Sequence, residues 1–198
     1  MVDGSRFYKT ETFAYDWLRI QDGRLFEGDG SQVEQWFNYG AEVIAAAEGT
    51  VVPVRDGMPE EVPGQPPVNV KTPRDYSGNH VVQIQPNVWA TYAHLQPGSI
   101  AVSVGDHVTT GQLLGLLGNT GNSLLAPPLH FQLSDGPEIA TSSSLPFVFD
   151  RYTLAGTVNP EDLWTVIEHR DNPVLPSAGT PQEQDETYAL GMTIQDFP

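Results

Sequence analysis

Residues 92–135 read YAHLQPGSIAVSVGDHVTTGQLLGLLGNTGNSLLAPPLHFQLSD, and this stretch has the clearest strand pattern of the chain. Apolar and polar residues alternate in its strand-like parts, glycines separate those parts, and a turn is expected at Gly105-Asp106. Alternation with a period of two is typical of strands that bury one face. The stretch therefore predicts short strands joined by turns, of which 128–135 (PLHFQLSD) is the last.

The sequence on either side continues this pattern. Two short strands separated at Gly49 are expected in 41–54 (AEVIAAAEGTVVPV), and a hairpin with its turn at Pro86-Asn87 is expected in 79–95. Further strands are expected at 12–20, 147–154 and 187–197. These patterns predict an all-β fold built on a mainly antiparallel sheet with long loops.

One helix is expected, and capping residues mark its start. Asn159 can cap the free amides, Pro160 suits the first helical position, and Asp162 lies where an acidic side chain is favourable. We expect this helix to end at about His169. The Pro-rich residues 171–186 that follow predict an exposed linker.

The chain length of 198 residues suits one domain with one core. We expect residues 1–155 to form that domain, and residues 156–198 to add the C-terminal helix, the Pro-rich linker and a terminal strand packed on or beside it. The terminal strand can pair with its own sheet, which we favour, or mediate self-association through a neighbour's exposed edge. The Pro-rich loop 56–78 is long enough to suggest a functional or partner-facing role.

Composition excludes several classes of function. Twenty-five Asp and Glu against nine Lys and Arg give a formal net charge of −16, which disfavours nucleic acid and anionic membranes as partners. No apolar run approaches the about 20 residues that span a bilayer, so membrane insertion is not expected. The N-terminal residues show no apolar segment of a signal peptide. Because the chain has no cysteine, disulfides and thiolate metal sites are excluded.

Three sequence elements, in the same order and with similar spacing, resemble those of a known family. They are Tyr-Ala-His-Leu at 92–95, Gly-Asp-x-Val-x-x-Gly-Gln at 105–112 and Leu-His-Phe at 129–131. With AEVIAAAEGTVV (41–52) and GNHVVQIQ (78–85), they resemble the β core of the lysostaphin/LytM-type zinc metallopeptidases, which cut peptide cross-links in bacterial cell walls. The resemblance covers roughly residues 12–150, and it implies a location at the cell envelope or outside the cell.

The resemblance also implies a zinc site that is incomplete in this chain. Asp16 and His130 match two of the family's zinc ligands, and His94 matches a histidine that assists catalysis. Thr12 stands where the family has a zinc-binding histidine, and Pro128 stands where it has a second catalytic histidine. Two protein ligands fall short of the three that catalytic zinc sites normally have.

Two functions are consistent with these residues. The first is an inactive, degenerate peptidase that needs no cofactor and binds a cell-wall peptide or protein partner, or has a structural role in an assembly. The alternative is an active zinc endopeptidase of peptidoglycan that uses a replacement ligand. We expect the sheet to carry a shallow groove bordered by Trp36, Tyr39 and Tyr92. The remaining histidines are expected to be surface residues: His80, His107 and His169.

Overall fold

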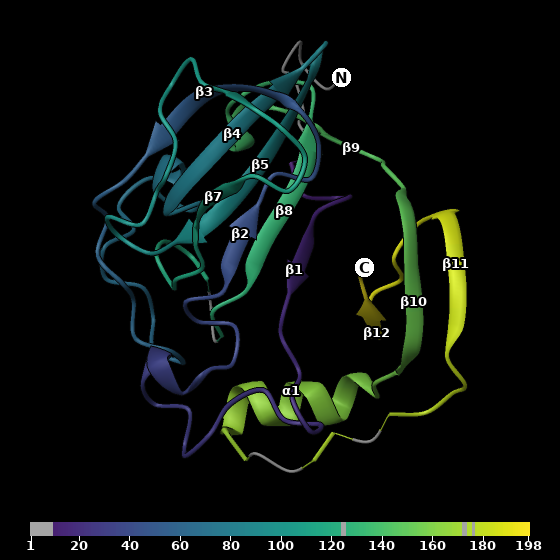
Figure 1. Ribbon diagram of the computed structural model, residues 1–198. Helices are drawn as coiled ribbons and strands as arrows, with labels where there is room; N and C mark the ends of the chain where they lie inside the picture. The colour runs from purple at the N-terminus through teal and green to yellow at the C-terminus, as the bar shows by residue number, and fades with distance from the viewer. Residues whose placement is uncertain (1–9, 124–125, 172–173, 176) are drawn as a thin grey trace, which may run out of the picture.

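A computed structural model describes residues 10–123, 126–171, 174–175 and 177–198. Residues 1–9, with which the expected first domain begins, lie outside the described part. The fold is a set of mainly antiparallel sheets, with one α-helix among the described residues (Figure 1). The all-β expectation is therefore confirmed.

The largest sheet has seven strands, and it holds the segments that the sequence marks most clearly. Its order along the main path is β1 (Tyr15–Trp17), β8 (Leu129–Ser134), β5 (Val88–Leu95), β4 (Asn79–Gln85), β3 (Gly49–Arg55) and β6 (His107–Val108), with β9 (Ser144–Leu145) paired to β8. The β4–β5 hairpin turns at Pro86-Asn87 as predicted, because Asn87 accepts the left-handed conformation of a tight turn (φ 63°).

A two-stranded sheet covers one face of the large sheet. It consists of β2 (Glu42–Ile44) and β7 (Leu113–Leu116), and β3 begins at Gly49, which confirms the break predicted there. Val43 and Leu114 of this small sheet are buried in one cluster with Tyr92 and Phe131 of the large sheet. Since strand residues alternate between faces, the other face of the large sheet is left for polar side chains.

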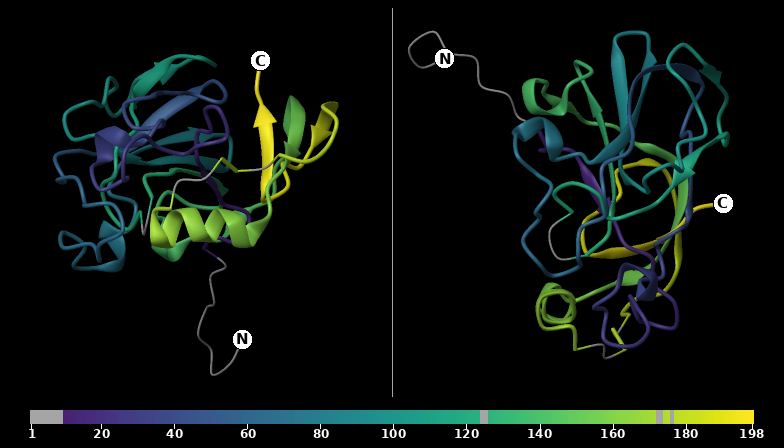
Figure 2. Two further views of the ribbon diagram at one scale, coloured as in Figure 1. Left: turned by 90° about the horizontal axis from the view of Figure 1, so that it is seen from below. Right: turned by 90° about the vertical axis from the view of Figure 1, so that its left-hand side faces the viewer.

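The helix α1 (Pro160–His169) has the predicted bounds. The side chain of Asn159 accepts a hydrogen bond from the Glu161 amide (2.8 Å), and Arg170 ends the helix in the left-handed conformation (φ 53°). The helix lies at one end of the molecule, below the strands in Figure 1 and in the right-hand view of Figure 2. None of the described helices is long and apolar enough to cross a membrane.

The expectation of one core is wrong, because the helix packs on a second buried cluster. Val166 and Ile167 of α1 contact apolar side chains from distant parts of the chain. The other buried members of this cluster are Leu25, Phe26, Trp36, Ala126, Val158 and Leu175.

A three-stranded sheet follows in the C-terminal part. β10 (Phe149–Thr157) lies between β11 (Gln182–Thr187) and β12 (Thr193–Asp196), so the terminal strand pairs within its own chain. The expected linker 171–186 is wrong at its end, where β11 begins, and residues 172–173 and 176 of it lie outside the described residues. The described 3-10 turns are η1 (Val33–Gln35), η2 (Pro73–Asp75) and η3 (Ile139–Thr141).

Aromatic rings join this C-terminal sheet to the edge of the large sheet. Trp17 of β1 packs edge-on against Phe149 of β10 (5.8 Å between ring centroids) and against Phe197 after β12 (5.4 Å). Tyr15 of β1 contacts Phe149 in the same way (5.8 Å). These contacts hold β1 in place from the side that β8 does not cover.

Candidate functional site

Asp16 and His130 lie on neighbouring strands at the edge of the large sheet. They are direct partners in the antiparallel register of β1 and β8, so their side chains share one face. His130 Nδ1 lies 3.0 Å from Asp16 Oδ1. The Asp16 side chain keeps 60% of its surface exposed, whereas that of His130 keeps 10%. The pair therefore forms one wall of a site that opens to solvent on the Asp16 side.

His94 reaches the same site through an irregularity in β5. Ala93 is the register partner of His130, and Tyr92 faces the core, so regular alternation would aim His94 at the core. Val81 pairs with Tyr92 but Asn79 pairs with Leu95, which leaves one extra residue in β5 between these pairs. Such a bulge changes the direction of a side chain. The extra residue brings the ring of His94 to 6.0 Å from that of His130, measured between centroids.

Three hydrogen bonds hold His94 in an uncommon backbone conformation. Its φ is +65°, in the left-handed region that only glycine occupies without strain. Its amide donates to Ser77 O (3.1 Å), its carbonyl accepts from the Gly118 amide (2.9 Å), and its Nδ1 lies 2.7 Å from Thr120 O. A carbonyl can only accept, so Nδ1 carries the proton and Nε2 carries the lone pair.

The charges at the site influence one another. Burial, and next the charge of His130, lower the pKa of His94 to about 4, so His94 is neutral at physiological pH. Burial also acts to lower the pKa of His130, but the hydrogen bond to Asp16 and its charge outweigh burial and raise it. For Asp16, burial acts to raise the pKa, and the hydrogen bond and charge of His130 outweigh it and lower the pKa.

These three side chains surround a small cavity of about 100 Å³. The end of the long loop 56–78 closes one side of it through Tyr76 and Ser77. Within that loop the Glu61 carboxylate accepts hydrogen bonds from the Val68 and Asn69 amides (2.8 and 2.7 Å). The loop is anchored to the rest of the chain because the Asn119 side chain donates to Glu61 O (2.7 Å) and the Met58 amide donates to the Asn79 side chain (2.8 Å). The other lining residues are Glu11, Asn122, Ser123, Pro128 and Ile139.

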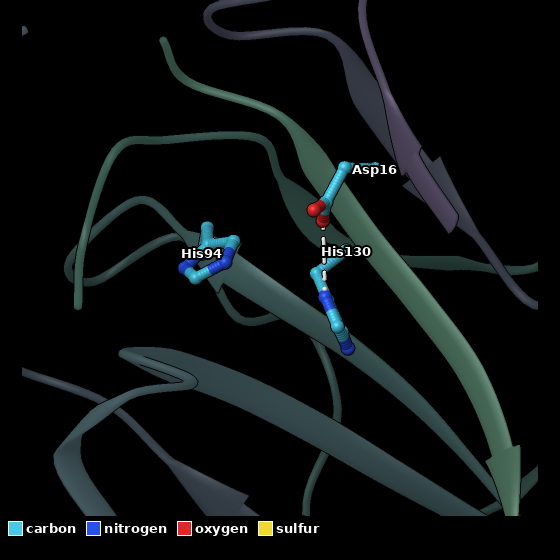
Figure 3. A group of neighbouring side chains, drawn as sticks. All are labelled: Asp16, His94 and His130. Atoms are coloured by element: carbon cyan, nitrogen blue, oxygen red, sulfur yellow. Dashed lines mark hydrogen bonds and ion pairs between the residues drawn. The ribbon is translucent and has the colours of Figure 1, made fainter. Parts of the chain in front are cut away.

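Asp16, His94 and His130 could hold a metal ion. Each offers one ligand atom, and these atoms lie within 4.8 Å of one another, as the close-up in Figure 3 illustrates. Two imidazoles and one carboxylate make a ligand set that zinc accepts, and catalytic zinc sites use three protein ligands with a fourth position left open. The residues present therefore fit a divalent metal by number and chemistry.

The two positions that depart from the family pattern differ in their surroundings. Pro128 lines the cavity but has no side-chain group that can take up a proton. Thr12 is exposed in the turn before β1 and is not among the residues that line the cavity. Its neighbour Glu11 does line it, which the spacing from Asp16 alone does not indicate.

The expected groove residues are placed elsewhere. Trp36 and Tyr92 are each 2% exposed, and they pack in the two cores instead of bordering a groove, so that assignment is wrong for both. The large rings gain more from burial than from exposure beside a groove. Tyr39 is half-buried, and its position beside a groove stays a prediction.

The remaining histidines also lie outside the small cavity. His80 is not the surface residue that was expected, because it is half-buried and lines a second cavity of about 230 Å³. His107 is exposed on β6, and His169 is exposed at the end of α1. The two cavities share Ser77 and Ile139, so they adjoin along one face of the large sheet.

The sequence model of Peptidase family M23 matches residues 33–141, more than half of the chain. The chain belongs to peptidase family M23. The match includes His94, Pro128 and His130. It begins after Asp16, so Asp16 is assigned to this M23 site because it pairs with His130 in the sheet. The predicted resemblance to lysostaphin/LytM-type peptidases is confirmed.

Similar proteins act on peptidoglycan or are described as zinc-containing. The peptidoglycan DD-endopeptidase ShyA of Vibrio cholerae serotype O1 is 36% identical over 91 residues, which are 46% of this chain and 20% of the relative. This M23 chain thus spans about a fifth of the length of that relative. Among solved structures, a zinc containing peptidase from Vibrio cholerae is 27% identical, with a TM-score of 0.37, over 54% of this chain and 26% of its own.

A second similar structure is the catalytic domain of the antimicrobial peptidase lysostaphin from Staphylococcus simulans. It is 26% identical over 55% of this chain and 69% of its own, with a TM-score of 0.39. Scores at this level are too low for residue-by-residue superposition. The roles of Asp16, His94 and His130 in this M23 domain are therefore argued from its own geometry.

Proposed function

We propose that this M23 domain binds its ligand without hydrolysing a peptide bond. The number of reactive groups at the site carries the proposal, because among the described residues only Asp16, His94 and His130 bring possible ligand atoms within 4.8 Å of one another there. If all three hold zinc, no imidazole remains to accept a proton. If His94 accepts the proton, two protein ligands remain, one fewer than catalytic zinc sites normally have.

Pro128 supports the proposal independently of the metal. A zinc ion bound at such a site polarises a carbonyl group and lowers the pKa of a bound water. A base must then accept the proton, and the proline ring beside His130 has no lone pair available for this. Metal binding and proton transfer therefore compete for the same imidazole, that of His94.

The ligand that we propose is a cell-wall peptide or an extended segment of a protein partner. The two adjoining cavities, which share Ser77 and Ile139, offer an elongated surface along the sheet that suits an extended chain better than a compact small molecule. The relative named as a peptidoglycan DD-endopeptidase supports the wall peptide as the first ligand to test.

A second candidate function is an active zinc endopeptidase in which Glu11 serves as the replacement ligand. This candidate is favoured by one observation, the presence of Glu11 among the residues that line the cavity. Asp16, His130 and Glu11 would then hold the metal, and His94 would remain free as a base. Against it, Glu11 is not part of the group whose ligand atoms lie within 4.8 Å of one another.

A digestion and binding experiment separates the two functions. Zinc-supplemented protein is incubated with purified cell walls and with a cross-linked wall peptide, and products are identified by mass spectrometry. We expect the wild type to sediment with the walls and to release no product. Pairing Pro128→His with Thr12→His, or with Glu11→His, supplies the missing groups and should produce cleavage in at least one combination. Chelator-sensitive cleavage by the wild type that Glu11→Gln abolishes would instead establish the second candidate.

A further inference from the structure

We infer that this site binds a divalent metal ion through Asp16, His94 and His130. His94 then serves as a metal ligand in place of the histidine that Thr12 replaces. We also infer that Gln132 is a positioning residue that presents the Nδ1 lone pair of His130 to the metal. This inference goes beyond the proposed function, because a metal can be held here whether or not a peptide bond is cut.

The position of His94 supplies the first step. Its Nδ1 proton is donated to Thr120 O (2.7 Å), which leaves the Nε2 lone pair as the atom that His94 can offer. His94 is buried (5% exposed), its backbone is held at a strained φ of +65°, and the bulge in β5 brings its ring to the face of Asp16 and His130. Strained conformations of this kind persist where the surroundings over-determine them, and they cluster at functional sites.

Gln132 supplies the second step. Its Oε1 lies 3.0 Å from His130 Nε2. Because an amide oxygen only accepts, Nε2 must be protonated and donate this hydrogen bond. A neutral His130 then has its lone pair on Nδ1, which faces Asp16 Oδ1 at 3.0 Å. Two electron pairs that face each other at this distance require a cation between or beside them, either a proton or a metal ion. A ligating imidazole whose other nitrogen donates to a fixed oxygen is the usual arrangement at metal sites.

Distances supply the third step. Two ligand atoms bonded to one tetrahedral zinc ion at about 2.0–2.1 Å lie roughly 3.3 Å apart. The ligand atoms here lie within 4.8 Å of one another, so side-chain shifts of about 1 Å bring them to bonding positions. The three residues come from adjacent strands in the order β1, β8 and β5, a rigid support that leaves the exposed side of Asp16 open for a further ligand.

Gln132 is also held in a way that a structural role alone does not explain. It is completely buried, and its Nε2 has no hydrogen-bond partner among the described residues. A buried donor without a partner destabilises the fold. A leucine or methionine would avoid that cost but could not accept the proton of His130 Nε2.

The test titrates metal-depleted full-length protein with Zn²⁺ by calorimetry and with Co²⁺ by visible absorption. We expect one metal per chain and Co²⁺ bands of tetrahedral intensity. His94→Gly, which accepts the positive φ, should weaken Zn²⁺ binding at least about 100-fold, and Gln132→Met should weaken it about 10–100-fold. Gln132→Glu retains the acceptor oxygen and should bind within a few-fold of the wild type. Thermal unfolding of each metal-free variant checks that it is folded.

Two further variants decide which third group binds the metal. Glu11→Gln and the exposed-surface control His107→Ala should bind Zn²⁺ like the wild type. No binding by the wild type, or unchanged affinity in His94→Gly, overturns the inference. Loss of affinity in Glu11→Gln overturns the role of His94, and equal affinity of Gln132→Met and the wild type overturns the role of Gln132. These outcomes do not depend on cleavage, so they are separate from a failure of the proposed function.

Discussion

His94 and His130 face one cavity with their ring centroids 6.0 Å apart, although Ala93, and not His94, is the register partner of His130. The bulge in β5 makes this approach possible, and the contacts of His94 with Ser77, Gly118 and Thr120 maintain it. The site therefore depends on the long loop 56–78 and on the glycine-rich turn after β7 as much as on the strands themselves.

The strain at His94 predicts an unusual order of stabilities among its variants. A non-glycine residue in the left-handed conformation costs about 1–2 kcal/mol, and glycine avoids most of this cost. Of two variants that both remove the imidazole, we expect His94→Gly to be more stable than His94→Ala by about 1 kcal/mol in urea unfolding. An alanine variant as stable as the glycine variant would show that the backbone relaxes at this position.

Close packing at Gly78 predicts a large cost for a small change. Gly78 has φ +58°, and a Cβ added there would lie 2.3 Å from Thr120 O, the carbonyl that also binds His94. Strain and overpacking together should make Gly78→Ala about 2–5 kcal/mol less stable than the wild type. The matched control is Gly57→Ala, which has φ +86° but nothing within 4 Å of the added Cβ, and should cost about 1–2 kcal/mol. If Gly78→Ala and Gly57→Ala lose the same free energy of unfolding in urea, the close packing at Gly78 is contradicted.

Glu60 predicts a pH-dependent stability. Burial, opposed by the hydrogen bond from the Asn119 amide, raises the pKa of Glu60 to about 7. The folded state then holds a proton that the unfolded state releases at lower pH, so this contribution is present below about pH 4.5 and is lost as the pH rises through about 7. Glu60→Gln should raise Tm by a few degrees at pH 8, on the order of 2–4 °C per kcal/mol, and by much less at pH 5. A gain that is the same at both pH values would contradict the raised pKa.

The aromatic contacts at the C-terminus predict that the last residues stabilise the fold. Phe197 is 45% exposed, yet it contacts the rings of Trp17, Phe149 and Tyr152. Its partial burial suggests that Phe197→Ala costs about 1–2 kcal/mol, less than a fully buried phenylalanine. Leu190→Ala is the control, since its side chain is more exposed and should change stability by less than about 0.5 kcal/mol. If Phe197→Ala and Leu190→Ala both change stability by less than about 0.5 kcal/mol, the C-terminal residues are held only through β12.

Local signals in the sequence account for the elements that were predicted correctly. Asn159 and Pro160 fix the start of α1, Pro86-Asn87 fixes the hairpin turn, and Gly49 separates two strands, because each acts through its own backbone preferences. β11 was missed because its sequence QEQDET is polar and charged, and its strand form depends on pairing with β10. The six residues of β11 contain no local sequence signal that indicates this pairing.

Tertiary structure decides the parts of the site that sequence patterns left open. The motifs indicated Asp16 and His130, and the register now places them side by side. The redirection of His94 arises from one extra residue in β5, and alternation in the sequence would have pointed its side chain to the core. Glu11 and Ser77 reach the cavity through loop geometry, which spacing along the chain does not encode. The chemical roles of these residues stay predictions.

Asp16, His94 and His130 are too few to bind zinc and also to accept a proton, and a single-turnover experiment measures the consequence. Zinc-loaded protein in large excess is mixed with a cross-linked wall peptide, and product is followed over many hours by mass spectrometry beside a His130→Ala control. With too few groups for both metal binding and proton transfer, wild type and control should release product at the same background rate. Faster release of product by the wild type, which a chelator abolishes, would show instead that the site hydrolyses peptide bonds.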